Sequence, residues 1–216
     1  TLMERTHYLL VAGFGWWKKG GITFLHARGG EAGPTFDRVV VDRRTGPIHV
    51  VPTDLKVEMI TGMVEAGITK MEATSFAHAR YLPQFADAEE VLRRIPRKKG
   101  VDYRGICTNM KGIQRAIASK DDGYGVDEIA MVISASEAHN LANVNMGHDE
   151  NKRLLEEMTR ASLETGHAVF GWVLTSFGCP INGDVPVEQA AAMGQWWKDI
   201  GATIIGTLTA TGILIK

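Results

Sequence analysis

Glu72 is the residue whose position most strongly suggests chemistry, because this carboxylate stands between Met71 and Ala73 in an apolar run. An ionised carboxylate in such a run is costly unless it meets a cation, a metal ion or hydrogen-bond donors. Groups placed in this way are often those that transfer protons or bind ligands. We therefore expect Glu72 to belong to a functional site.

Four polar loops that follow apolar runs could surround this carboxylate. They contain hydroxyl, amide, carboxylate and imidazole side chains and comprise residues 74–78, 108–109, 134–140 and 175–180. In parallel α/β folds the chemistry lies at the carboxyl ends of the strands, so these loops would converge on one face. The alternative is that the hydroxyls serve turns and helix caps, which is the commoner use of each one taken singly.

The elements that must position these groups follow from an alternation that begins near residue 50. Short apolar runs predict five strands, at 68–74, 103–108, 128–134, 168–176 and 202–208. Between them, apolar residues recur at helical spacing. Parallel strands with right-handed helical crossovers are therefore expected. Periodicity alone leaves open both an open doubly wound sheet and a closed barrel.

The composition is that of an ordinary globular protein and excludes several functional classes. The 24 Lys and Arg residues are matched by 25 Asp and Glu residues, and the formal net charge is −1. No positive surplus is available to bind a phosphate backbone, so we expect no nucleic-acid partner. The 216 residues suit one domain of ordinary size or two small ones. They are fewer than the roughly 250 of a complete eight-stranded α/β barrel.

The cysteines and the N-terminal apolar run bear on the cellular compartment. Cys107 and Cys179 are the only cysteines and form no C-x-x-C pair, so we expect no disulfide framework and a reducing, cytoplasmic location. The apolar run 8–17 is too short to span a bilayer and is followed at once by Lys18 and Lys19. We expect this run to be a buried strand and turn, with no membrane association.

A nucleotide-binding domain is one alternative. The run 8–12 is followed by Gly13 and Gly15, as in a dinucleotide-binding turn. The third glycine, Gly20, comes too late for the G-x-G-x-x-G pattern, and a tight turn explains the first two glycines equally well.

Longer stretches resemble the 3-hydroxy-3-methylglutaryl-CoA (HMG-CoA) lyases of the DRE-TIM metallolyase barrels. Residues 72–76, Glu-Ala-Thr-Ser-Phe, and residues 177–180, Phe-Gly-Cys-Pro, are the clearest motifs. The other similar segments occur in the family's order at 51–56, 63–68, 82–91, 108–112, 134–137, 143–145 and 183–186. The resemblance covers about residues 50–200.

The resemblance implies a TIM (β/α)8-type barrel, here incomplete, with about six βα units. We expect a single domain over residues 1–216, with residues 1–38 of uncertain structure. The implied reaction is the cleavage of an acyl-CoA, HMG-CoA or a related 3-hydroxyacyl-CoA, to acetyl-CoA and acetoacetate. The implied cofactor is a divalent cation, Mg²⁺ or Mn²⁺, which would bind the substrate oxygens and stabilise the enolate.

The resemblance also implies roles for individual residues. Glu72 matches the family's active-site glutamate, and Ser75, Asn143 and Asn145 match polar positions that line the substrate end. Trp172 stands where the family usually has an active-site tyrosine, so it retains an aromatic wall and lacks the hydroxyl.

The sequence departs from the family at its metal ligands. The Arg-Asp-Gly-Leu-Gln motif is absent, and counting back 30 residues from Glu72 reaches Asp42, which becomes the candidate metal ligand. Thr209 stands where the family has an aspartate, and the family's His-x-His ligands would lie beyond Lys216. Cys179 lies in the Phe-Gly-Cys-Pro segment and is expected to be an inert buried thiol.

These departures leave two hypotheses, an active lyase and a catalytically inactive partial barrel or binding protein. An open barrel would expose unpaired strand edges, which self-association or a partner would have to cover, and we expect a homo-oligomer.

Overall fold

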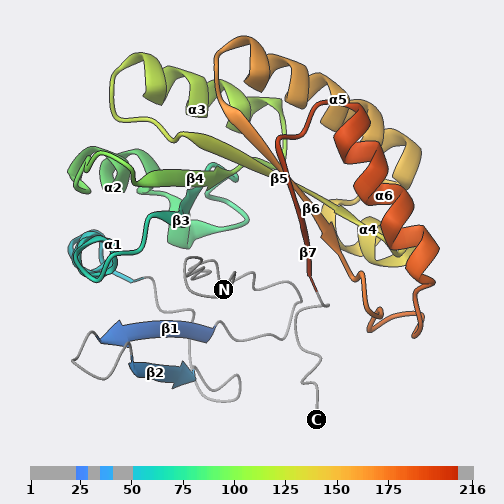
Figure 1. Ribbon diagram of the computed structural model, residues 1–216, viewed down its shortest axis with the longest axis horizontal. Helices are drawn as coiled ribbons and strands as arrows, with labels where there is room; N and C mark the ends of the chain where they lie inside the picture. Colours follow the sequence, from blue (N-terminus) through green and yellow to red (C-terminus); the bar gives the residue numbers. More distant parts are fainter. Residues whose placement is uncertain (1–22, 29–34, 41–50, 209–216) are drawn as a thin grey trace, which may run out of the picture.

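The computed structural model describes residues 23–28, 35–40 and 51–208 (Figure 1). Three sequence predictions concern residues outside these ranges. They are the metal-ligand role of Asp42, the strand at 8–12 with the glycines that follow it, and the substitution at Thr209.

A five-stranded parallel sheet forms the centre of the protein. Its strands lie in sequence order and are β3 (Lys70–Ser75), β4 (Asp102–Ile106), β5 (Glu128–Ser134), β6 (Ala168–Leu174) and β7 (Ile204–Thr207). All four strand pairs are parallel. The predicted α/β fold with five strands between residues 68 and 208 is confirmed, and the sheet is that of a partial barrel.

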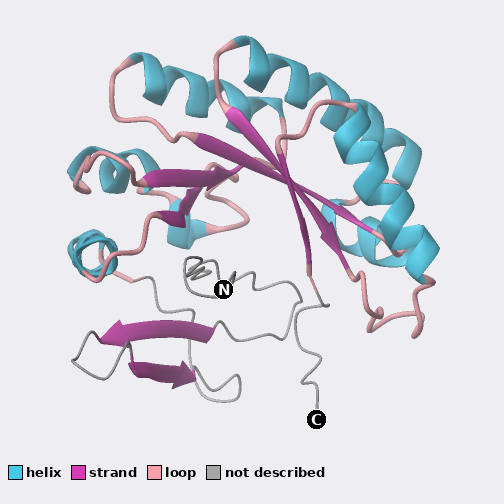
Figure 2. Cartoon of the chain, in the orientation of Figure 1, coloured by secondary structure: helices cyan, strands magenta, loops and turns pink. Residues whose placement is uncertain are grey.

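Helices connect successive strands and line one side of the sheet (Figure 2). They are α1 (Thr53–Glu65), α2 (Ala88–Arg94), α3 (Met110–Asp121), α4 (Glu137–Val144), α5 (His148–Glu164) and α6 (Val187–Asp199), with a short 3₁₀ helix at Pro83–Phe85. Among the described residues, no helix is both long enough and apolar enough to cross a bilayer.

Two further strands, β1 (Thr23–Arg28) and β2 (Thr35–Val40), form a separate antiparallel pair. Among the described strands, β2 pairs with β1 alone and does not join the parallel sheet. The described sheet therefore contains five of the approximately six βα units expected, and the strand preceding Asp42 is not one of them.

The segment 134–140, predicted to be a loop, contains the start of helix α4. Ser136 is its N-cap, and the Ser136 hydroxyl oxygen accepts a hydrogen bond from the backbone N–H of His139 at 3.2 Å. Such a cap satisfies a backbone donor that the first turn leaves free. The helix ends at Asn145, whose φ of 57° is left-handed, a conformation that asparagine tolerates better than most residues.

The two faces of the sheet have different neighbours because strand side chains alternate. Met71, Tyr103 and Ile129 belong to the large buried cluster between the sheet and the helices. Phe170 lies on the opposite face, in a smaller cluster with Ile106 and Ala130.

Gly171 on β6 allows the largest fully buried side chain, Trp197 of α6, to pack flat against the sheet. A Cβ atom at position 171 would lie 2.4 Å from Trp197 Cδ2. The Trp197 indole Nε1–H donates to the carbonyl of Trp172 at 3.3 Å, which fixes the ring further.

We predict that Gly171→Ala destabilises the fold, because Trp197 cannot move without leaving the core. Overpacking of this kind typically costs about 1–3 kcal/mol. Urea unfolding monitored by tryptophan fluorescence gives the free energy of unfolding. Gly194→Ala is the matched control, since the nearest atom to its Cβ is 3.9 Å away and alanine favours a helix over glycine. Equal stability of Gly171→Ala and the wild type would contradict the prediction.

Candidate functional site

Glu72 lies on the face of the sheet opposite the helix-side core. Its neighbour Met71 packs into the helix-side cluster, so the alternation of β3 turns Glu72 to the other face. The Glu72 side chain is buried, with 3% of the residue exposed. Neither carboxylate oxygen has a hydrogen-bond partner among the described residues. The carboxylate is therefore available to a ligand that can donate a hydrogen bond.

Burial raises the pKa of Glu72 from the usual 4.5 to about 7. Removal from water disfavours the charged form, and this effect exceeds the opposing influence of the positive charge on Arg104. The Trp172 indole lowers the pKa of Glu72 as well, although the geometry gives the Glu72 oxygens no hydrogen bond. Glu72 can thus accept or donate a proton near neutral pH.

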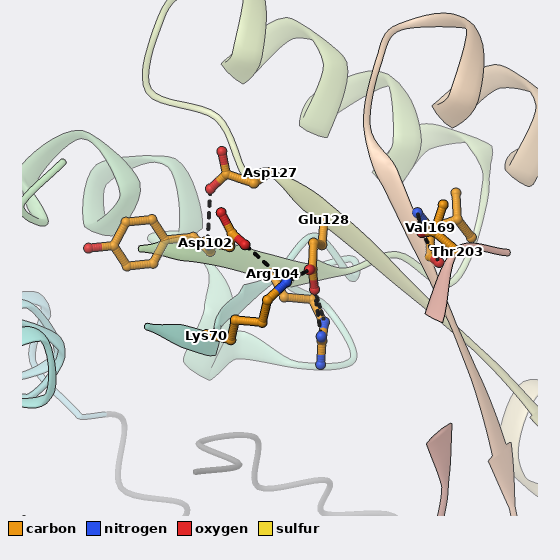
Figure 3. A network of polar contacts seen from close by, with 8 residues as sticks. Lys70, Asp102, Arg104, Asp127, Glu128, Val169 and Thr203 are labelled. Carbon is orange, nitrogen blue, oxygen red and sulfur yellow. Dashed lines mark hydrogen bonds and ion pairs between the residues drawn. The ribbon is translucent and has the colours of Figure 1, made fainter. Parts of the chain in front are cut away.

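A network of ion pairs, drawn in Figure 3, involves strand residues on the same sheet face as Glu72. Arg104 Nε donates to Glu128 Oε2 at 2.9 Å, and a second guanidinium nitrogen contacts the same oxygen. Lys70 Nζ lies 2.7 Å from Glu128 Oε1 and 3.0 Å from Asp102 Oδ2. Arg104 and Glu128 are both buried, so the pairing compensates for the water they have lost.

Trp172 on β6 forms an aromatic wall on this face. Its ring centroid lies 4.5 Å from that of Phe170, and the two rings are tilted by 42°. Gly206 on β7 makes room for the indole, because a Cβ atom there would lie 2.4 Å from Trp172 Cζ3. The structure therefore places Glu72 and Trp172 on the same face of the sheet. Their predicted catalytic and substrate-binding roles stay predictions.

Ser75, the last residue of β3, is buried and its hydroxyl is engaged within the chain. Ser75 Oγ accepts from the backbone N–H of Ala77 at 3.2 Å and lies 3.5 Å from the carbonyl of Ile106. This hydroxyl serves the turn after β3, which is the structural use considered for such residues. Its predicted contact with substrate stays a prediction.

Asn143 and Asn145 lie at the end of α4, after β5. Asn143 is 5% exposed, whereas Asn145 is exposed and forms the left-handed C-cap. The two amides therefore have different surroundings although they are two residues apart. Their predicted role in substrate binding stays a prediction.

The described residues do not form a metal site by themselves. Within residues 51–208 and the two short strands, no three His, Cys, Asp or Glu side chains are grouped so that they could hold a metal ion. Glu72 is a single buried carboxylate with free oxygens, and Asp42 lies outside the described residues. The Mg²⁺ or Mn²⁺ ion implied by the resemblance therefore stays a prediction.

Both cysteines are free thiols, as expected. Cys179 is 4% exposed and lies 3.1 Å from Asn182 Oδ1. It therefore belongs to the turn after β6.

The HMGL-like family model matches residues 43–214. The chain belongs to this family. The sequence is 33% identical over 202 residues to the mitochondrial hydroxymethylglutaryl-CoA lyase of Bos taurus, covering 87% of this chain and 61% of the bovine protein.

Solved structures of HMGL-like relatives have the same fold. An HMG-CoA lyase from A. baumannii, solved with coenzyme A and 3-methylmalate, superposes with a TM-score of 0.70 at 30% identity. The lyase from Brucella melitensis gives a TM-score of 0.69 at 33% identity. This chain is covered to 77% and 74%, and those two chains to 52% and 54%. The HMGL-like chain thus spans about half the length of these structures.

The sequence interpretation missed the ion pairs of this HMGL-like chain. Arg104 and Glu128 stand in largely buried strands, as Glu72 does. The cost of burying charge, applied to all three residues, would have identified them together.

We predict that Glu72→Gln changes how stability depends on pH. Between pH 4.5 and about 7 the folded protein holds a proton at Glu72 that the unfolded chain has released, so wild-type stability falls as pH rises through this window. At about 1.4 kcal/mol per pKa unit, the ionised form costs about 3 kcal/mol above pH 7.

Glu72→Gln should lack this loss, so its free energy of unfolding relative to wild type should increase between pH 5 and pH 8. Urea unfolding at both pH values measures the change. The exposed Glu157→Gln on α5 is the control. Parallel pH profiles for Glu72→Gln and the wild type would show that Glu72 does not titrate in this way.

Proposed function

We propose that this chain is the part of an HMG-CoA lyase-type enzyme in which Glu72 transfers a proton during carbon–carbon bond cleavage of an acyl-CoA. The observation that supports this most directly is the buried Glu72 carboxylate, whose oxygens have no partner among the described residues. Family membership supplies the reaction class. The substrate we propose is HMG-CoA or a related 3-hydroxyacyl-CoA.

The chemistry requires a group that takes the proton of the substrate's tertiary hydroxyl. As that proton leaves, the carbon–carbon bond breaks, acetoacetate departs and the enolate of acetyl-CoA remains to be protonated. A carboxyl group with a pKa of about 7 is ionised often enough to accept the proton at neutral pH. We propose that Trp172 forms an aromatic wall of the substrate site, with Ser75, Asn143 and Asn145 as further contacts.

A divalent cation would supply stabilisation of the enolate oxygen if bound. The described residues do not complete a site for it. Asp42 remains the proposed ligand from this chain.

We predict that the full chain, incubated with HMG-CoA and Mg²⁺ or Mn²⁺, releases acetoacetate. Glu72→Ala should reduce turnover by about 10²-fold or more, which is typical for loss of a general acid–base group. Cys179→Ser should retain most of the activity, because the Cys179 thiol is buried against Asn182 within its own turn and is given no role in the reaction. Coupled reduction of acetoacetate with NADH provides the assay.

Absence of product, together with an unchanged melting temperature in the presence of HMG-CoA and either cation, would overturn the enzyme proposal. The inactive partial-barrel hypothesis would then stand. A melting shift with HMG-CoA but no product would indicate a binding protein.

The remaining predictions concern the oligomeric state and the cellular location of the protein. A homo-oligomer is proposed because β3 and β7 are the outer strands of the described sheet and exposed edges favour association. Light scattering of the purified protein measures its oligomeric state. A cytoplasmic location stays a prediction.

A further inference from the structure

The charged residues of the five parallel strands are gathered on one face and toward one end. They are Lys70 and Glu72 on β3, Asp102 and Arg104 on β4, and Glu128 on β5. Strands β6 and β7 contribute none. Every charged group that these strands place near Glu72 is therefore part of this set.

The strand register sets three of these residues side by side. Glu72 pairs with Arg104 across β3 and β4, and Arg104 pairs with Glu128 across β4 and β5. Neighbouring strands lie about 4.8 Å apart, so Arg104 stands between two carboxylates. Its positive charge acts on both of them.

The guanidinium of Arg104 is fixed in place. Glu128 Oε2 accepts from Nε at 2.9 Å and from a second guanidinium nitrogen. The Phe170 ring lies against the guanidinium, 3.6 Å from Cζ to the ring centroid. Lys70 and Arg104 converge on the Glu128 carboxylate in Figure 3, so Glu128 is held as well. The Arg104 guanidinium is thus preorganised, and it cannot turn fully toward Glu72.

The charges of the network balance without Glu72. Lys70 and Arg104 are cations, and Asp102 and Glu128 are their paired anions. Ionised Glu72 is the one carboxylate of the set that lacks a direct partner within the described part of the chain. The field at Glu72 is therefore the sum of the positive field of Arg104 and the opposing field of Glu128.

We propose that Arg104 is a positioning residue for Glu72. The fixed positive charge of Arg104, partly offset by the negative charge of Glu128, sets how readily the Glu72 carboxylate takes up a proton. The consequence for catalysis rests on the proposed function, in which Glu72 transfers that proton. The effect of Arg104 on the protonation of Glu72 does not depend on the proposed function and can be measured without turnover.

The test removes, one at a time, the two partners of the Arg104–Glu128 ion pair. Arg104→Met removes the cation, so the titration midpoint of Glu72 should rise by about 1–3 pH units, the usual effect of an adjacent opposite charge. Glu128→Gln removes the competing anion and leaves Arg104 and Lys70 in place, so the midpoint should fall. A loss of structure would move both variants in the same direction.

The measurement is carbon-13 NMR of the full chain labelled at the glutamate carboxyl carbons, with the Glu72 signal assigned by its absence in Glu72→Gln. Arg104→Lys keeps the charge and should stay closer to wild type than Arg104→Met. Arg115→Met is the matched control, because Arg115 pairs with Glu89 at 2.7 Å and lies near the Phe76 ring, away from Glu72. It should leave the midpoint unchanged.

Shifts in the same direction for Arg104→Met and Glu128→Gln, or no shift in either, would overturn the proposal. If Arg104→Met does not fold, Glu128→Gln and Arg104→Lys still decide it. Where acetoacetate is formed, the pH profile of kcat/KM should move with the NMR midpoint. Opposite NMR shifts without any turnover would support the role of Arg104 and refute the lyase function.

Discussion

The cost of holding a carboxylate away from water governs the face of the sheet on which Glu72 lies. Without compensation, such a group stays protonated at neutral pH. A positive charge offsets part of this cost only if it is itself held in place. Glu128 and Phe170 hold Arg104, and parallel pairing in register sets Arg104 beside Glu72. The electrostatics of the site therefore depend directly on the strand register.

Packing on both sides of the sheet depends on two glycines in neighbouring strands. Gly171 of β6 admits Trp197 from the helix side, and Gly206 of β7 admits Trp172 on the other side. The two indoles are linked, since Trp197 donates to the backbone carbonyl of Trp172. The core packing of α6 and the aromatic wall beside Glu72 are therefore joined through one residue of β6.

The apolar pattern was sufficient to predict the strands of the parallel sheet, because short apolar runs alternate with longer stretches whose apolar residues recur at helical spacing. The strand at 128–134 matches β5 at both ends. Helix α4 was missed because eight residues with several polar side chains give little periodicity. Its signal was the Ser136 cap. Arg104 and Glu128 were missed because partners in space belong to strands far apart in sequence.

The state of Glu72 bears on the choice between an active enzyme and an inactive relative. A buried carboxylate with unpartnered oxygens destabilises the fold above pH 7, whereas a glutamine would fill nearly the same volume without a charge. Proteins accept such costs where activity requires a strained or destabilised group. A chain that had lost its chemistry would gain stability by replacing Glu72, since Arg104 is already paired with Glu128. The unpaired carboxylate next to a fixed arginine therefore supports the proposed function, in which Glu72 transfers a proton.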